Sequence, residues 1–138
     1  MFSLVRKGDN MKLLIIVLAI CAGLLIAGCA VRNNMASKGF KQISQEEAKT
    51  KMTEGSIIVD VRTKEEYDEG HIPGAICIPN ETINNTAPSE LPDMDAVILV
   101  YCRSGRRSKE ASQKLAEIGY TNIYEFGGIN SWTGDVVK

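Results

Sequence analysis

Residue types that build several common kinds of functional site are scarce in this sequence. Its 138 residues include one histidine, His71, and four cysteines, none of them closely spaced. This set does not supply the ligands of a zinc site, so we expect no metal. The formal net charge of -1 lacks the excess of basic residues that nucleic-acid binding requires, so we expect no nucleic acid as a partner. The length suits one compact domain with an appendage and excludes two domains.

Residues 11–30, MKLLIIVLAICAGLLIAGCA, differ in composition from the rest of the chain. A basic residue is followed by a long apolar stretch and by small residues that end at a cysteine, which is a secretory pattern. The segment resembles a bacterial lipoprotein signal, which implies that residues 1–28 are removed and that Cys29 is acylated. Translation starts either at Met1 or at Met11. A plain transmembrane anchor is the alternative, but the apolar stretch is shorter than the roughly 20 residues of a typical span.

On this interpretation, Cys29 and a polar tether to residue 39 connect a membrane to a domain of residues 40–138. The protein is then expected to be anchored by lipid on the extracytoplasmic side of a bacterial membrane. Of the four cysteines, only Cys77 and Cys102 then lie in the folded domain. The compartment is expected to be oxidising, so these two are the ones that could form a disulfide. Cys77 lies in the apolar segment AICIP, where we favour a small core residue over a partner for Cys102. A disulfide between them requires bonding distance, which the sequence does not decide.

From residue 40 onward, short apolar runs alternate with polar stretches. Ser44 with Glu47, and Thr63 with Glu66, form the capping-box pattern that opens a helix. We predict strands at 40–43, 57–61, 75–78, 96–101 and 123–126, and helices at 44–54, 63–70 and 107–118. The run at 96–101, AVILVY, is apolar throughout, as a strand buried on both faces must be. The alternation predicts an α/β domain with a parallel sheet, in which ligands bind beyond the carboxyl ends of the strands.

Beyond the carboxyl end of the strand at 96–101 the sequence reads CRSGRRS, residues 102–108. Gly105 allows a backbone conformation in which successive N–H groups turn inward and surround an anion. Inward amides, a helix N-terminus near Arg107 and positive charge together lower a cysteine pKa from about 8.5 to between about 3.5 and 7.5. Cys102 is therefore the candidate nucleophile, as a thiolate that needs no adjacent base.

The arginines of this loop are the candidate substrate-binding side chains. Arg103, Arg106 and Arg107 can hold an oxyanion, because a guanidinium group binds two oxygens at once. For Arg107, a solvated position at the helix start is equally consistent with the sequence. A cysteine phosphatase would have an arginine at the position of Ser108. The loop therefore suits a single extra sulfur atom on Cys102 better than a phosphoryl group.

Three segments, in order, are similar to single-domain rhodaneses: DVRTKEEYDEGHIPGAICIPN (60–80), CRSGRRS (102–108) and GGINSW (127–132). The resemblance covers residues 40–133 and implies a small central parallel sheet of five strands with helices on both faces. It also implies that Cys102 takes a sulfane sulfur from thiosulfate or a similar anionic donor as a persulfide and passes it to cyanide or a thiol. The loop that would bind the substrate consists of Arg103, Ser104, Gly105, Arg106 and Arg107. No cofactor is expected.

Two other functions stay open. A non-catalytic sulfur-relay or binding module would keep this fold and loop but would depend on a protein as sulfur acceptor or donor, and a cysteine phosphatase is less favoured. Asp60 and Arg62 flank one residue at a strand end, where we expect an ion pair that supports the site. His71 lies in a turn, which favours a hydrogen-bonding role over catalysis. Trp132 is expected to pack rather than to bind substrate.

Overall fold

The computed structural model describes residues 39–138. The predicted signal peptide, Cys29 and all but the last residue of the predicted tether lie outside these residues. Between residues 39 and 138, no helix has both the length and the apolar character needed to cross a membrane.

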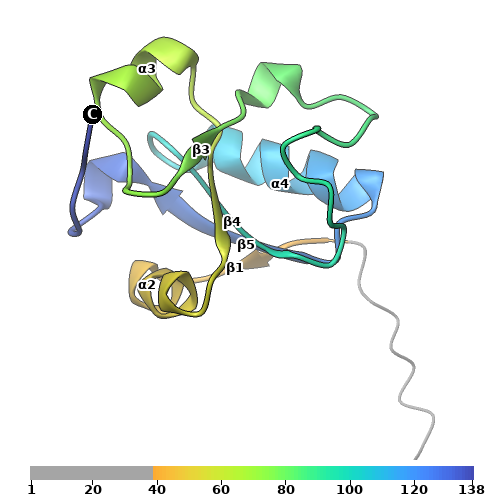
Figure 1. Ribbon diagram of the computed structural model, residues 1–138, viewed down its shortest axis with the longest axis horizontal. Helices are drawn as coiled ribbons and strands as arrows, with labels where there is room; N and C mark the ends of the chain where they lie inside the picture. The colour runs from red at the N-terminus through yellow and green to blue at the C-terminus, as the bar shows by residue number, and fades with distance from the viewer. Residues whose placement is uncertain (1–38) are drawn as a thin grey trace, which may run out of the picture. The chain divides into compact units, whose positions relative to one another are not determined.

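One parallel sheet forms the centre of the described domain (Figure 1). Its five strands within residues 39–138 are β1 (Lys41–Gln42), β2 (Ile57–Asp60), β3 (Ile76–Cys77), β4 (Val97–Cys102) and β5 (Asn122–Gly128). Their order across the sheet is β1-β5-β4-β2-β3, and every neighbouring pair is parallel. β4 thus lies in the interior of the sheet, and its residues 98–102 are buried. Its apolar sequence is that of a strand covered on both faces.

The helices of the described residues follow the strands in the predicted order. They are α2 (Gln45–Thr53), α3 (Lys64–Glu69) and α4 (Arg106–Ile118), with 3-10 turns η1 (Asn80–Thr82) and η2 (Ile129–Ser131). At the start of α2, the side chain of Ser44 accepts a hydrogen bond from the N–H of Glu47 over 3.1 Å. At α3 the capping box is complete, because Thr63 and Glu66 each bond the backbone N–H of the other. Both capping patterns therefore mark helix starts, as predicted.

α2 and α4 lie on opposite sides of the sheet, as Figure 1 shows. Val100 and Cys102 of β4 belong to an apolar cluster with Leu115 of α4. Tyr101, between them in sequence, belongs to a second cluster with Ala48 of α2. This alternation follows from the two-residue repeat of a strand. The predicted α/β fold, a five-stranded parallel sheet with helices on both faces, is confirmed within the described residues.

Candidate active site

Cys102 is the last residue of β4, where the chain turns toward α4. The residue is 1% exposed. The backbone N–H of Gly105 donates a hydrogen bond to its Sγ over 3.0 Å, and the hydroxyl oxygen of Ser108 lies 3.5 Å from the same sulfur. Gly105 has φ of 112°, in the left-handed region that glycine tolerates. This backbone conformation turns an amide toward the sulfur, as the sequence predicts.

The surroundings of Cys102 favour its ionised form. Burial raises the pKa of the thiol, and this is the largest single effect. Hydrogen bonds from the Ser108 hydroxyl and from the backbone N–H groups of Ser108, Gly105 and Ser104 act in the opposite direction and outweigh it. The pKa of Cys102 therefore lies below its ordinary value, and three of the four groups that lower it are backbone amides.

Gly128 allows this loop to close against the sheet. The register between β4 and β5 shifts after Val100, so that Cys102 pairs with Gly128. A Cβ added to Gly128 would lie 2.0 Å from the backbone carbonyl oxygen of Arg103, closer than any real contact. The second glycine of the GGINSW segment is thus the residue that makes room for the loop that follows Cys102.

The three loop arginines point to different partners. Arg107 donates two hydrogen bonds to the carboxylate of Glu66, over 2.7 and 3.0 Å, and its side chain is 17% exposed. Arg103 lies 3.2 Å from the same carboxylate and is half-exposed. Arg106 is 79% exposed and makes a long contact of 3.8 Å with Glu110, one turn further along α4. The sequence allowed Arg107 to be a solvated residue at the helix start. In the structure Arg106 is the solvated arginine, and Arg107 is bound to Glu66.

Glu66 connects the loop to α3. The hydrogen bonds from Arg107 lower its pKa from 4.5 to about 2, with further contributions from the Thr63 N–H and from the charges of Arg107 and Arg103, while burial acts in the opposite direction. The Cys102 thiolate is in turn among the charges that raise the pKa of Arg107, after Glu66. The sequence identified Glu66 only as part of a capping box. That box was nevertheless a usable signal, because it places Glu66 in the first turn after β2, at the edge of the sheet where Cys102 also lies.

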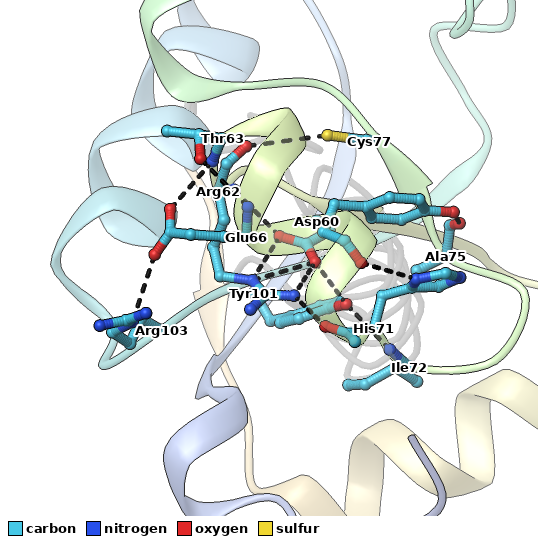
Figure 2. A network of polar contacts seen from close by, with 12 residues as sticks. Asp60, Arg62, Thr63, Glu66, His71, Ile72, Ala75, Cys77, Tyr101 and Arg103 are labelled. Carbon is cyan, nitrogen blue, oxygen red and sulfur yellow. Dashed lines mark hydrogen bonds and ion pairs between the residues drawn. The ribbon is translucent and has the colours of Figure 1, made fainter. Parts of the chain in front are cut away.

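The expected ion pair between Asp60 and Arg62 is present and buried (Figure 2). Arg62 donates to the Asp60 carboxylate from its backbone N–H, over 2.9 Å, and from its side chain, over 2.6 to 3.1 Å. The hydroxyl of Tyr101 donates to the same carboxylate over 2.7 Å and accepts from the N–H of Ile72. Burial raises the pKa of Tyr101, so the hydroxyl keeps its proton. The cluster therefore braces β2 against the residue that directly precedes Cys102.

The remaining candidates have structural contacts. A ring nitrogen of His71 lies 2.9 Å from the carbonyl oxygen of Tyr67, and the two rings stack 3.7 Å apart. Cys77 is free and only half-buried, so it is not the core residue that the sequence favoured, because β3 is an edge strand of the sheet. Its Sγ lies 3.8 Å from the Arg62 carbonyl oxygen, and burial raises its pKa. The ring of Trp132 packs against Phe126, with centroids 5.8 Å apart. These positions agree with supporting roles outside the loop.

The contacts of Ser108 and Glu125 are a second part of the site that the sequence did not predict. The Ser108 hydroxyl lies 2.6 Å from Oε1 of Glu125 on β5, and Glu125 is 2% exposed. A carboxylate inside an otherwise apolar strand is unusual and was an available signal for Glu125. Its proximity to Cys102 depends on the pairing of β5 with β4, which periodicity alone does not specify.

The sequence and the structure of this chain are similar to those of known proteins of one family. The rhodanese-like domain family matches residues 44–135. The chain is 38% identical over 80 residues to thiosulfate sulfurtransferase PspE of Escherichia coli (strain K12), an alignment that covers 58% of this chain and 77% of that protein. It is 36% identical over 94 residues to thiosulfate sulfurtransferase GlpE of Pseudomonas entomophila (strain L48), covering 67% of this chain and 84% of that protein. The crystal structure of a rhodanese-like domain protein from Staphylococcus aureus is 35% identical, with a TM-score of 0.57 over 69% of this chain and 92% of that one. The chain therefore belongs to the rhodanese-like domain family and is a thiosulfate sulfurtransferase-like enzyme.

Proposed function

We propose that this enzyme carries sulfane sulfur as a persulfide on Cys102, from thiosulfate or a similar anionic donor to cyanide or a thiol. The observation that carries the proposal is the position of the Cys102 sulfur. This sulfur lies at the carboxyl end of β4 and accepts a hydrogen bond from the Gly105 N–H over 3.0 Å. Its surroundings lower the pKa of the thiol. A thiolate at this place is the nucleophile that the reaction requires.

The loading step needs only the thiolate and the donor. Sγ of Cys102 attacks the outer sulfur of thiosulfate, and a sulfur–sulfur bond forms. The bond between the two sulfurs of thiosulfate breaks, and sulfite leaves with the bonding electron pair. One negative charge stays on the protein, now on the outer sulfur of the persulfide. The loop N–H groups beside Sγ, such as that of Gly105, support this step because they would stabilise the negative charge of the persulfide.

The discharge step returns the enzyme to its starting state. Cyanide or a thiolate attacks the outer sulfur, and the bond to Sγ breaks. Cys102 leaves as a thiolate, with the electron pair of the broken bond. The hydrogen bonds that lower its pKa make it a good leaving group. No cofactor takes part in either step.

Donor binding is assigned to the outer part of the loop. Arg106 is exposed and Arg103 half-exposed, so both can meet an anion that approaches from solvent. Arg107 already donates two hydrogen bonds to the carboxylate of Glu66, which makes it a support for the loop rather than a free anion ligand. The steering of the donor therefore depends mainly on Arg103 and Arg106.

We also propose that the enzyme is anchored by lipid on the extracytoplasmic side of a bacterial membrane, on the composition of residues 11–30 alone. Expression with a labelled fatty acid tests this. The wild-type chain should take up the label and sediment with membranes, and Cys29→Ala should do neither. Sedimentation of the Cys29→Ala variant with membranes would support a transmembrane anchor instead.

A turnover assay tests the function. The purified protein should form thiocyanate from thiosulfate and cyanide, Cys102→Ser should form none, and Cys77→Ser should retain the activity. Loading of Cys102 without thiocyanate formation would support a sulfur-relay module that discharges to a protein partner. Release of phosphate from an aryl phosphate, without sulfur transfer, would support a phosphatase.

A further inference from the structure

A buried carboxylate that the proposed mechanism does not use lies next to the active site. Oε1 of Glu125 accepts the hydroxyl proton of Ser108 over 2.6 Å and the backbone N–H of Gly127 over 2.8 Å. Oε2 lies 3.3 Å from the side-chain amide of Gln42 on β1. Burial of a carboxylate is costly, and neutral donors offset that cost only in part. Such a residue beside a nucleophile is a candidate for a functional role.

The Ser108 hydroxyl is the connection between this carboxylate and the nucleophile. Its oxygen lies 2.6 Å from Oε1 of Glu125 and 3.5 Å from Sγ of Cys102. A hydroxyl group has one proton to donate. When both neighbours are anionic, they compete for that proton, and the shorter distance favours the carboxylate. The carbonyl oxygens of Gly105 and Gly127 also lie near the hydroxyl, at 3.0 and 3.4 Å, but they are neutral and attract its proton less than an anion does. The hydroxyl therefore stabilises the Cys102 thiolate mainly to the extent that Glu125 releases its proton.

We propose that Glu125 is a positioning residue for Cys102: it holds the Ser108 proton away from the sulfur and so keeps the thiolate more basic than the loop amides and a fully donating Ser108 hydroxyl would together leave it. This inference deepens the proposed function and rests on Cys102 being the sulfur carrier. Basicity matters because the nucleophilicity of a thiolate rises with it, with a Brønsted coefficient of about 0.4–0.5. The amides keep the sulfur ionised, and Glu125 preserves its reactivity toward the donor.

The other charged groups near this cluster come from the loop, α4 and α3. Arg107 lies close enough to Cys102 for their charges to interact, and Glu66 of α3 binds both Arg107 and Arg103. The pKa of Glu66 is about 2, and the pKa of Arg107 is raised, so these two groups keep their charge between about pH 5 and pH 9. β1 contributes the neutral side chain of Gln42. Changes in this pH range therefore report mainly on Cys102 and its coupling to Glu125.

The Glu125→Gln variant tests the proposal. The full chain is treated with iodoacetamide at a series of pH values, and mass spectrometry of the Cys102 peptide measures how fast Cys102 is alkylated at each pH. The glutamine oxygen can still accept from the Ser108 hydroxyl and the Gly127 N–H, but as a neutral group it competes less well with the thiolate. The midpoint of the alkylation profile should shift to lower pH by about one unit. Glu117→Gln, which removes an exposed carboxylate of α4, should leave the midpoint unchanged.

A double-mutant cycle separates action through Ser108 from direct charge repulsion. Removing a nearby negative charge would by itself favour the thiolate, so the single variant does not distinguish the two. In a Ser108→Ala background the shift caused by Glu125→Gln should largely disappear. An equal shift in both backgrounds would show direct repulsion and overturn the proposal, as would an absence of any shift in the single variant.

Glu125→Asp provides a second route if the glutamine variant does not fold. It keeps the charge but withdraws the carboxylate from Ser108, so the midpoint should again move to lower pH, and an unchanged midpoint would contradict the proposal. Thermal melting of each variant establishes that it is folded. The alkylation readout does not require sulfur transfer. A wild-type protein that fails to form thiocyanate therefore refutes the proposed function, while the coupling between Glu125 and Cys102 is measured separately.

Discussion

Glu66→Gln tests how far the active-site loop depends on its ion pairs with α3. Glutamine is the other residue that completes a capping box, so its side-chain oxygen can still accept the Thr63 N–H at the start of α3. It can also accept one hydrogen bond from Arg107. The substitution therefore removes the negative charge that Arg107 and Arg103 share, while it preserves the shape of the helix start.

The size of the expected effect follows from the pKa of Glu66. Its fall from 4.5 to about 2 corresponds to about 3.5 kcal/mol, at about 1.4 kcal/mol for each pKa unit. The side chain is 18% exposed, so screening by water reduces this, and we expect a loss of about 1–2 kcal/mol in the free energy of unfolding at pH 7. Because the folded-state pKa is lowered, this stabilisation is present above pH 4.5 and is lost as the pH falls through about 2.

Urea denaturation at several pH values measures this effect. The difference between the wild type and Glu66→Gln should be full at pH 7, should shrink below pH 4.5 and should vanish near pH 2. Glu65→Gln, which alters an exposed carboxylate in the same turn, should change the free energy of unfolding by at most about 0.5 kcal/mol. Equal stability of the wild type and Glu66→Gln at pH 7, or a difference that grows in acid, would refute the reasoning.

Three further predictions concern the loop and its surroundings. Arg106→Ala should raise the KM for thiosulfate several-fold, and by more than the KM for an uncharged sulfur donor; equal effects on both donors would reject electrostatic steering. Gly128→Ala should abolish most thiocyanate formation and lower the melting temperature, because its Cβ would collide with the Arg103 carbonyl oxygen, and an active, equally stable variant would show that the loop can move aside. His71→Ala should retain most of the turnover and lose about 1–2 kcal/mol of stability with the Tyr67 contacts; a folded but inactive variant would place His71 in the mechanism.

The fold could be predicted from the sequence because its strongest local patterns, an apolar strand and two capping boxes, all indicate the same alternation of strands and helices. The apolar run before Cys102 is the buried strand β4, and both capping boxes begin helices. Gly105 adopts the left-handed conformation that the loop chemistry required. The position of Cys102 at the end of β4 followed from these elements, since parallel strands in such sheets present their carboxyl ends to ligands.

The contacts of the site were harder to predict because they join segments far apart in the chain. Arg107 binds Glu66, 41 residues away, and Ser108 binds Glu125, 17 residues away. Nothing in the spacing of the loop distinguishes Arg106, which is exposed, from Arg107, which is bound. The direction of each side chain depends on how α3 and β5 pack against the loop, and that is a property of the tertiary structure.

The central claim is that one ionised thiol, that of Cys102, accepts a single sulfur atom from the donor. It is tested most directly by measuring the mass of the Cys102 peptide after brief exposure of the protein to thiosulfate at neutral pH, and again after cyanide is added. The claim predicts a gain of one sulfur atom on Cys102 with release of one sulfite, and loss of that sulfur as thiocyanate. An unmodified Cys102, or sulfur found on Cys77 instead, would contradict it.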